Sequence, residues 1–290
     1  MPCRLQAVML ICPILLIAGC FGFPARLPAR AEVQVPQFRA SAQSAPPVTV
    51  TPPPPPNLDS ANPDESPLHR LAMKAAESEK TLNSYIVRVR RHDMTDGKEH
   101  PEEIILCKFR RAPLSILCKW LGTEAHGREI LYVKDQHEDK IHVITGQGDF
   151  LGPGRKMALP PDSALVRKNL RYPVTEASLG AVAIRFTTLV DAIENGQHNK
   201  GSAKYLSEQN RPEFPLPVEA VEQTIPAGLE PGLTRGGVRF YYFDPVLNIP
   251  TVVVTFDHNR RQVEYFSFDR LQAPVDLDDA DFDPNVIWKR

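Results

Sequence analysis

The 290-residue sequence has almost no net charge, and this excludes one broad class of function. Lys and Arg together number 34 and Asp and Glu 35, so the formal net charge is −1. A protein that binds nucleic acid through its phosphates needs a clear excess of basic residues. We therefore expect no nucleic-acid partner.

The motifs of common catalytic and cofactor sites are missing as well. A glycine-rich stretch at 146–154 is not followed by the Gly-Lys-Ser or Gly-Lys-Thr of a phosphate loop. There is no Gly-x-Ser-x-Gly elbow and no His pair at the spacing of a zinc protease. The acidic run at 276–283 lacks the central Gly and final Glu of a calcium loop, so we interpret it as a solvated acidic turn. We expect no catalytic residues, no metal and no cofactor, and hence a protein that is not an enzyme.

Proline is abundant, and its distribution divides the chain. Fourteen of the 29 prolines lie in the first 67 residues, including the run Pro52 to Pro56. Residues 20–64 show neither a helical nor a strand period, which is typical of a Pro-rich disordered tether. The sequence predicts that a single α+β domain occupies residues 65–290.

The first nineteen residues have the pattern of a secretory signal. Arg4 is their only charge, and the apolar stretch from Ala7 to Ile17 is too short to span a bilayer. The segment Leu16-Ile17-Ala18-Gly19-Cys20 resembles the lipobox of bacterial lipoproteins. That resemblance implies cleavage before Cys20, its acylation, and a membrane as partner. The alternatives are an ordinary signal peptide with a chance Cys and an uncleaved amphiphilic tail.

Two of the five cysteines would keep an unmodified thiol after such processing, and both lie in a predicted hairpin. Cys107 and Cys118 flank a turn at 111–113, and a register centred on that turn pairs Cys107 with Cys118, Ile105 with Trp120 and Phe109 with Ile116. In an oxidising compartment two opposed Cys form a disulfide, and otherwise they are two small buried hydrophobic residues. Both interpretations stay open here.

Hydrophobic periodicity predicts a helix, a meander, a second helix and a second meander. We expect helices at 66–83 and 175–195, with Thr175 as N-cap of the second, and a long loop at 146–169. Strands are expected at 85–92, 104–110, 116–120, 127–133, 140–144, 218–225, 239–243, 251–256 and 262–268.

The faces of these elements predict a one-sided sheet and a covering helix. The first strands place apolar side chains on one face and Arg88, Arg90, Lys108 and Arg110 on the other. The second helix carries an apolar stripe, whereas Arg185, Asp191 and Glu194 fall largely on its opposite side. The residues predicted to line a ligand cavity between sheet and helix are Tyr85, Val87, Val89, Ile105, Phe109, Trp120, Leu179, Val182, Phe186 and Leu189.

Several segments resemble a bacterial family catalogued as a domain of unknown function, DUF1571. They include 108–115, Lys119-Trp120-Leu121, 127–133, Arg171-Tyr172-Pro173-Val174-Thr175, Tyr241-Tyr242-Phe243-Asp244 and 279–283. The layout is similar, more distantly, to the envelope lipoprotein-carrier fold of LolA, LolB and RseB. That resemblance implies a curved antiparallel sheet, a half-open barrel, whose concave face is covered by one N-terminal helix and one long helix.

The leading hypothesis is a non-enzymatic, lipid-anchored protein of the bacterial cell envelope that faces the periplasm. It would bind an apolar ligand, such as a lipid or a lipoprotein acyl chain, in the curved sheet. Phe21 stands where Asp favours the inner membrane, so the outer membrane is preferred. A second hypothesis is a sensor or interaction module that binds another envelope protein. The third is an enzyme whose site forms by convergence of residues distant in the sequence.

Overall fold

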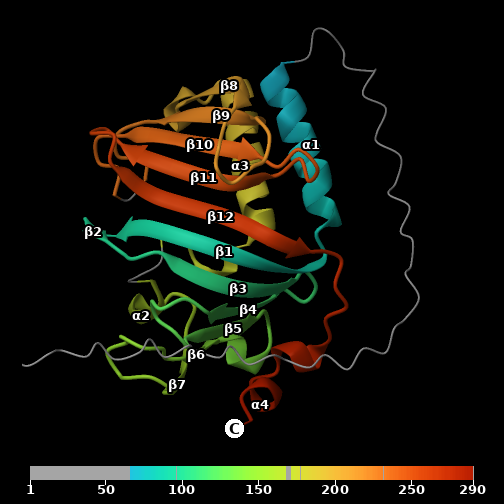
Figure 1. Cartoon of the computed structure of the whole chain (residues 1–290), viewed down its shortest axis with the longest axis vertical. Coiled ribbons are helices and arrows are strands. Elements are labelled where there is room, and N and C mark those ends of the chain that lie inside the picture. Colours follow the sequence, from blue (N-terminus) through green and yellow to red (C-terminus); the bar gives the residue numbers. More distant parts are fainter. Residues whose placement is uncertain (1–65, 96, 168–170, 177, 231, 290) are drawn as a thin grey trace, which may run out of the picture. The chain divides into compact units, whose positions relative to one another are not determined.

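The first and the last long strands of the chain lie side by side at the centre of one antiparallel sheet (Figure 1). The computed structural model describes residues 66–289 apart from 96, 168–170, 177 and 231. The predicted signal peptide, Cys20 and the predicted tether lie outside the described residues. The sheet is open, with strand order β7-β6-β5-β4-β3-β1-β12-β11-β10-β9-β8 and β2 paired to β1.

Two meanders build this sheet, as the sequence predicts. The first comprises β1 Ser84–Thr95, β2 Lys98–Glu99, β3 Glu103–Arg110, β4 Ser115–Trp120, β5 Glu129–Val133, β6 Ile141–Ile144 and β7 Lys156–Leu159. The second comprises β8 Ser202–Gln209, β9 Val218–Ile225, β10 Gly237–Phe243, β11 Pro250–Asp257 and β12 Gln262–Gln272. The pairing of β1 with β12 joins them, so the curved α+β fold expected from the sequence is confirmed.

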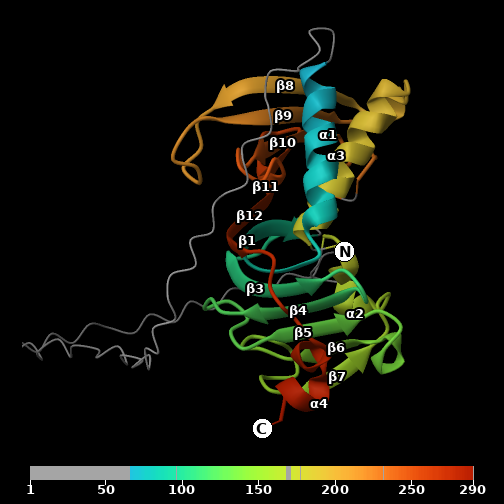
Figure 2. The same cartoon turned by 90° about the vertical axis from the view of Figure 1, so that its right-hand side faces the viewer.

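Two helices cover one face of the second meander (Figure 2). α1 spans Pro67–Thr81 and buries Leu71, Ala72 and Ala75, and α3 spans Leu179–Glu194. The helices pack on each other, and both contact β8. None of the described helices is long and apolar enough to cross a bilayer.

Local chemistry explains where α3 begins and ends. The Ser178 side chain accepts a hydrogen bond from the backbone N–H of Ala181, so Ser178 is the N-cap and the prediction of Thr175 is wrong. Thr175 lies instead in the short 3-10 helix η3, Val174–Glu176. At the other end Gly196 has φ 73° and the N–H of Gln197 donates to the carbonyl of Ala192, which is the Schellman arrangement of a helix C-terminus.

Five further elements correct the sequence-based prediction. The segment 146–169, expected as a loop, contains β7 and the short helix α2, Ala164–Arg167. The edge strand β8 was not predicted, because its mixed burial gives no clean alternation. Beyond β12 the chain forms a 3-10 helix, η5 Asp279–Phe282, and the short helix α4 Pro284–Ile287.

The C-terminal segment covers the convex face of the first meander. Phe282 and Trp288 pack on Leu117 and Leu131 in a small separate core. Lys108 pairs with Asp281 at 2.5 Å and Arg110 with Asp279 at 2.8 Å. The acidic run is therefore a partner for the basic face of the sheet rather than a solvated turn. Asp278 and Asp281 also form a capping box that starts η5.

Candidate ligand cavity

The concave face of the sheet is built from rows of side chains that the strand register sets side by side. One row is polar and runs across five strands, through Gln223, Arg239, Thr255, Glu264 and Asp93. Farther along the strands, Phe268, Val89, Ile105 and Trp120 form an apolar row. Because strand side chains alternate, both rows face the same side, and the concave surface changes from polar to apolar along its strands.

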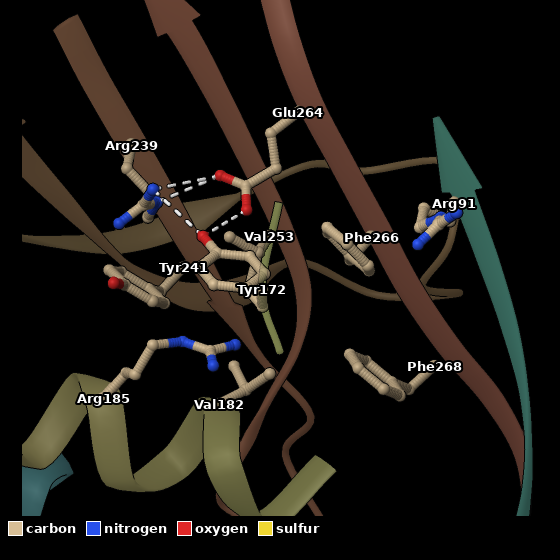
Figure 3. A pocket seen from close by; sticks show the side chains of 10 residues that line it. All are labelled: Arg91, Tyr172, Val182, Arg185, Arg239, Tyr241, Val253, Glu264, Phe266 and Phe268. Carbon is tan, nitrogen blue, oxygen red and sulfur yellow. Dashed lines mark hydrogen bonds and ion pairs between the residues drawn. The ribbon is translucent and has the colours of Figure 1, made fainter. Parts of the chain in front are cut away.

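The polar row holds a buried ion-pair network (Figure 3). Arg239 donates from Nη2 to Glu264 Oε2 at 3.1 Å and to Glu230 Oε2 at 2.7 Å. Thr255 donates to the same Glu264 oxygen, and Tyr172 Oη donates to Glu264 Oε1 at 2.5 Å. The Glu264 side chain is 1% exposed. The network ties the segment before α3 to the floor of the sheet, because Tyr172 belongs to that segment.

The charges of this network change one another's protonation equilibria. Burial alone would raise the pKa of Glu264, but the positive charges of Arg239 and Arg171, with hydrogen bonds from Thr255 and Tyr172, lower it to about 2. Burial and the nearby Glu264 charge raise the pKa of the Tyr172 hydroxyl. At neutral pH the cluster therefore contains an ionised carboxylate, cationic guanidiniums and a neutral phenol.

Two adjoining cavities lie on the concave face and share Arg91 and Phe266. Cavity 1 is lined by Arg91, Tyr172, Val182, Arg185, Arg239, Tyr241, Val253, Glu264, Phe266 and Phe268. Cavity 2 is lined by Val89, Arg91, Ile105, Cys107, Cys118, Trp120, Ile130, Val174 and Phe266. Their volumes are about 30 and 40 Å³, enough for a water molecule in each. Cavity 1 has a polar wall, and cavity 2 is nearly all apolar.

Arg185 reaches cavity 1 from α3. Its guanidinium carbon lies 4.1 Å from the centre of the Tyr172 ring, and Nη1 donates to the carbonyl of Glu176 at 3.1 Å. The sequence placed Arg185 on the side of α3 opposite the apolar stripe, and this expectation is wrong for the guanidinium. The long side chain bends over Tyr172, next to Val182 (Figure 3).

Two buried polar atoms near the cavities have no hydrogen-bond partner among the described residues. One is the indole Nε1 of Trp120, which lines cavity 2. The other is Oδ2 of Asp93, which lies 3.8 Å from Nε of Arg91, too far for a hydrogen bond. Burial raises the pKa of the Asp93 carboxyl. Unpartnered buried groups of this kind cost stability, so a ligand or water that reached Trp120 would recover part of it.

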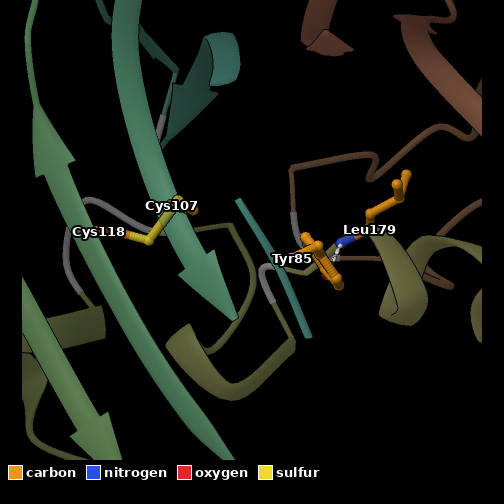
Figure 4. Close-up of a disulfide and its surroundings, with 4 residues drawn as sticks. All are labelled: Tyr85, Cys107, Cys118 and Leu179. Carbon is orange, nitrogen blue, oxygen red and sulfur yellow. Dashed lines mark hydrogen bonds between the residues drawn. A yellow bond between two sulfur atoms is a disulfide. The ribbon is translucent and has the colours of Figure 1, made fainter. Parts of the chain in front are cut away.

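Cys107 and Cys118 are joined by a disulfide in the wall of cavity 2 (Figure 4). They face each other in the β3–β4 ladder, where Ile105 pairs with Trp120 and Phe109 with Ile116. This register is the one predicted from the turn at 111–113. The turn fixes the register because a hairpin pairs residues at equal distances from its centre.

The residues predicted to line a cavity fall into two groups. Val89, Ile105 and Trp120 line cavity 2, and Val182 lines cavity 1. Tyr85, Val87, Phe109, Leu179, Phe186 and Leu189 are buried in the surrounding core and are not among the lining residues. Tyr85 stacks on Phe109 at 4.8 Å and accepts the backbone N–H of Leu179 (Figure 4), so it serves the first turn of α3.

The described part of the chain offers no cluster of three or more His, Cys, Asp or Glu side chains able to hold a metal ion. The convergent polar groups are those of the Arg239–Glu264 network, whose hydrogen bonds are largely made within the protein. The site therefore has one polar end, in cavity 1, and one apolar end, in cavity 2.

The sequence of residues 82–286 matches the family described as "Protein of unknown function (DUF1571)". The chain belongs to this family. The match includes every described strand, and all residues that line the two cavities lie within it. No curated protein matches the DUF1571 chain.

Solved structures similar to the DUF1571 chain come from several bacteria. The lipoprotein LppX of Mycobacterium tuberculosis is 15% identical with a TM-score of 0.44, covering 73% of this chain and 98% of that one. A LolA superfamily protein from Nitrosomonas europaea is 9% identical with a TM-score of 0.36, covering 76% of this chain and 98% of that one. The MucA/MucB complex of Pseudomonas aeruginosa is 10% identical with a TM-score of 0.41, covering 74% of this chain and 60% of that one.

Reasoning from sequence missed the polar half of the DUF1571 site. Tyr172 and Glu264 are 92 residues apart, and Arg239 and Glu230 belong to other segments. The available signal was the alternation in β10 and β12, which puts Arg239 in phase with Tyr241 and Glu264 in phase with Phe266. A charged residue on the buried side of a strand needs a partner, so this alternation predicts a buried ion pair.

Proposed function

We propose that this DUF1571 chain binds an apolar ligand or acyl chain on the concave face of its sheet, without catalysing a reaction. The observation that supports this most directly is the pair of adjoining cavities within an otherwise close-packed core. Val89, Ile105 and Ile130 give cavity 2 a hydrocarbon wall, which favours an apolar occupant.

Binding of a whole chain requires the walls to separate. The cavities hold about 30 and 40 Å³, far below the roughly 300–1,000 Å³ of a typical ligand pocket. An acyl chain would therefore enter by moving the covering residues, such as Val174 and Val182, away from the strands. The hydrocarbon surface thus exposed would be covered again by the ligand.

We further propose that acylated Cys20 anchors the protein to a membrane of the cell envelope, with the outer membrane preferred. The lipobox-like segment ending in Cys20 and the Pro-rich stretch 20–64 support this placement. The folded part would then face the periplasm, where the Cys107–Cys118 disulfide is stable.

The binding proposal is tested with the full-length protein extracted from membranes. Native mass spectrometry should detect a retained lipid, and a fluorescent fatty acid should bind and be displaced by unlabelled fatty acid. Ile105→Phe places a larger side chain in the wall of cavity 2 and should weaken probe binding. Val246→Phe adds the same ring at a position 83% exposed and should not. Absence of both retained lipid and probe binding in the parent protein rejects the proposal.

One observation favours an interaction module as a second candidate. Phe150 is fully exposed, and Leu151 next to it is half exposed, at the tip of the β6–β7 connection. That connection is well braced, since Asp149 pairs with Arg128 and accepts the N–H of Gly146. A photo-crosslinker at position 150 should then capture an envelope protein, and Phe150→Ser should abolish the capture without lowering the melting temperature.

A further inference from the structure

The geometry points to an anionic single-chain amphiphile as the ligand, with its acidic head at Arg185 and its hydrocarbon chain directed toward Trp120. This inference rests on the proposed function, because it assumes that the two cavities bind one molecule. It adds the charge of the head group and the direction of the chain. Three features support it. Arg185 has hydrogen-bond donors that its neighbours do not use, the other arginines of cavity 1 are already paired with carboxylates, and cavity 1 is more polar than cavity 2.

Arg185 has hydrogen-bonding capacity that its neighbours do not use. A guanidinium carries five N–H donors, and among the described residues Arg185 makes one hydrogen bond, to the carbonyl of Glu176. The nearest carboxylate oxygen, Oε2 of Glu176, lies 3.9 Å away. Stacking on Tyr172 holds the guanidinium in place but leaves its edges free. A carboxylate or phosphate fits such an edge with two parallel hydrogen bonds.

The other cations of cavity 1 are already neutralised. Arg239 hydrogen-bonds to two carboxylates, those of Glu264 and Glu230. Arg91 donates to Glu103 from Nε at 2.8 Å and also through Nη2. A new anion at either one would compete with a buried carboxylate, whereas Arg185 has no such competitor at hydrogen-bond distance. The head group is therefore assigned to Arg185.

Cavity 2 suits the opposite end of the same molecule. Ile105, Ile130 and Val174 and the disulfide form most of its wall, and Arg91 and Phe266 connect it to cavity 1. A chain that starts at Arg185 and passes Phe266 would reach Trp120. The apolar wall has no counter-charge for a head group other than the paired Arg91, so the reverse orientation would leave the anion without a partner.

The first experiment separates head-group recognition from chain binding. Palmitate and hexadecanol have the same chain and differ in charge at neutral pH, and both are titrated against the full-length protein. Arg185→Gln should weaken palmitate binding about tenfold or more, as loss of a charge-assisted hydrogen bond does, and leave hexadecanol unchanged. Arg235→Gln removes the same charge from an exposed position and serves as control. Thermal melting of each variant checks that it is folded.

The second experiment measures the direction of the chain. The protein has two tryptophans, and Trp288 lies in the separate core on the convex face. In Trp288→Phe, a fatty acid brominated near its methyl end should quench Trp120 fluorescence more than one brominated near its carboxylate. In Trp120→Phe neither should quench the remaining Trp288.

The outcomes distinguish the two levels of proposal. If the parent protein binds neither palmitate nor hexadecanol, the proposed function fails. If both bind and Arg185→Gln affects them equally or not at all, the proposed function stands and the head-group assignment is overturned. Stronger quenching by the bromines near the carboxylate overturns the direction of the chain.

Discussion

Two regions of the same concave face are packed differently. Under the middle of α3, Phe186 is completely buried and contacts Tyr241 and Phe243 of β10, with ring centres 5.4 and 4.9 Å apart. Farther across the sheet, around Ile105 of β3 and Trp120 of β4, cavity 2 remains. Both regions have apolar side chains in strand alternation. The difference lies in what covers them, because α3 presents a continuous apolar stripe whereas Val174 comes from a short 3-10 helix.

This difference shows that sheet periodicity predicts burial but not close packing. A helix that fits a sheet fills the space with interlocking side chains, and a short irregular segment leaves gaps. The packed region then provides stability, and the gap is the place where the walls would separate for the proposed ligand.

The largest effect is expected for Phe186→Ala in the packed region. Removing a fully buried ring should lower the free energy of unfolding by about 3–5 kcal/mol, since the surrounding aromatic residues leave a new void. Ile105→Ala, at the wall of an existing cavity, should cost less than Phe186→Ala. Urea denaturation of the two variants provides the comparison, and equal losses would contradict the difference in packing.

A slightly smaller loss of stability is expected when the pH is lowered and the carboxylate of the polar network is protonated. The pKa of Glu264 is about 2 in the folded protein and near 4.5 in the unfolded chain, so ionised Glu264 stabilises the fold above pH 4.5. This contribution should disappear as pH falls from about 4.5 to 2, and its full size is about 3 kcal/mol.

The variant Glu264→Gln isolates that contribution. It should be destabilised at neutral pH, because Arg239 then keeps only Glu230 as a charged partner. Its stability should also change less between pH 6 and pH 3 than that of the parent. Parallel pH profiles for the two proteins would show that Glu264 does not carry the acid sensitivity.

The Cys107–Cys118 disulfide, in the wall of cavity 2, should contribute somewhat less to the free energy of unfolding than Glu264 does. Its ring spans a sequence separation of 11, for which loop-closure entropy predicts about 3 kcal/mol at most. The double variant Cys107→Ala, Cys118→Ala should lose about 2–3 kcal/mol when compared with the oxidised parent. Denaturation of the parent with and without a reducing agent should show a similar difference, and an unchanged midpoint would contradict a structural role.

Local information predicted one half of this molecule well. The β3–β4 register, the end of α3 at Gly196 and both meanders depend on neighbouring residues, so turn chemistry and periodicity were sufficient. The pairing of β1 with β12 was not predicted, because it joins strands separated by the whole domain. The N-cap Ser178 was missed since Thr175, three residues earlier, has the same capping chemistry.

The candidate site divides in the same way. Val89, Ile105, Trp120 and Val182 were predicted as lining residues from their faces alone. Tyr172, Arg185 and Glu264 were not, because their positions depend on contacts between distant segments and on a long side chain that leaves its helix face. Periodicity also cannot separate core from cavity wall, so Phe186 and Val182 looked alike in sequence.

The smallest effect, and the sharpest comparison, comes from adding one methylene group in each region. Val190 is fully buried on α3, and Val190→Ile should cost about 1–3 kcal/mol because a close-packed site has no room for it. Val89 lines cavity 2, and Val89→Ile should leave stability unchanged or raise it by up to about 0.8 kcal/mol, the value of one buried methylene. The same variant should weaken fatty-acid binding, since the added group occupies the ligand's space, whereas Val190→Ile should not alter affinity beyond its effect on folding. Urea denaturation and probe titration of both variants measure this. Equal destabilisation by the two substitutions would mean that the region around Val89 is packed as tightly as the region under α3, and the distinction between them would no longer hold.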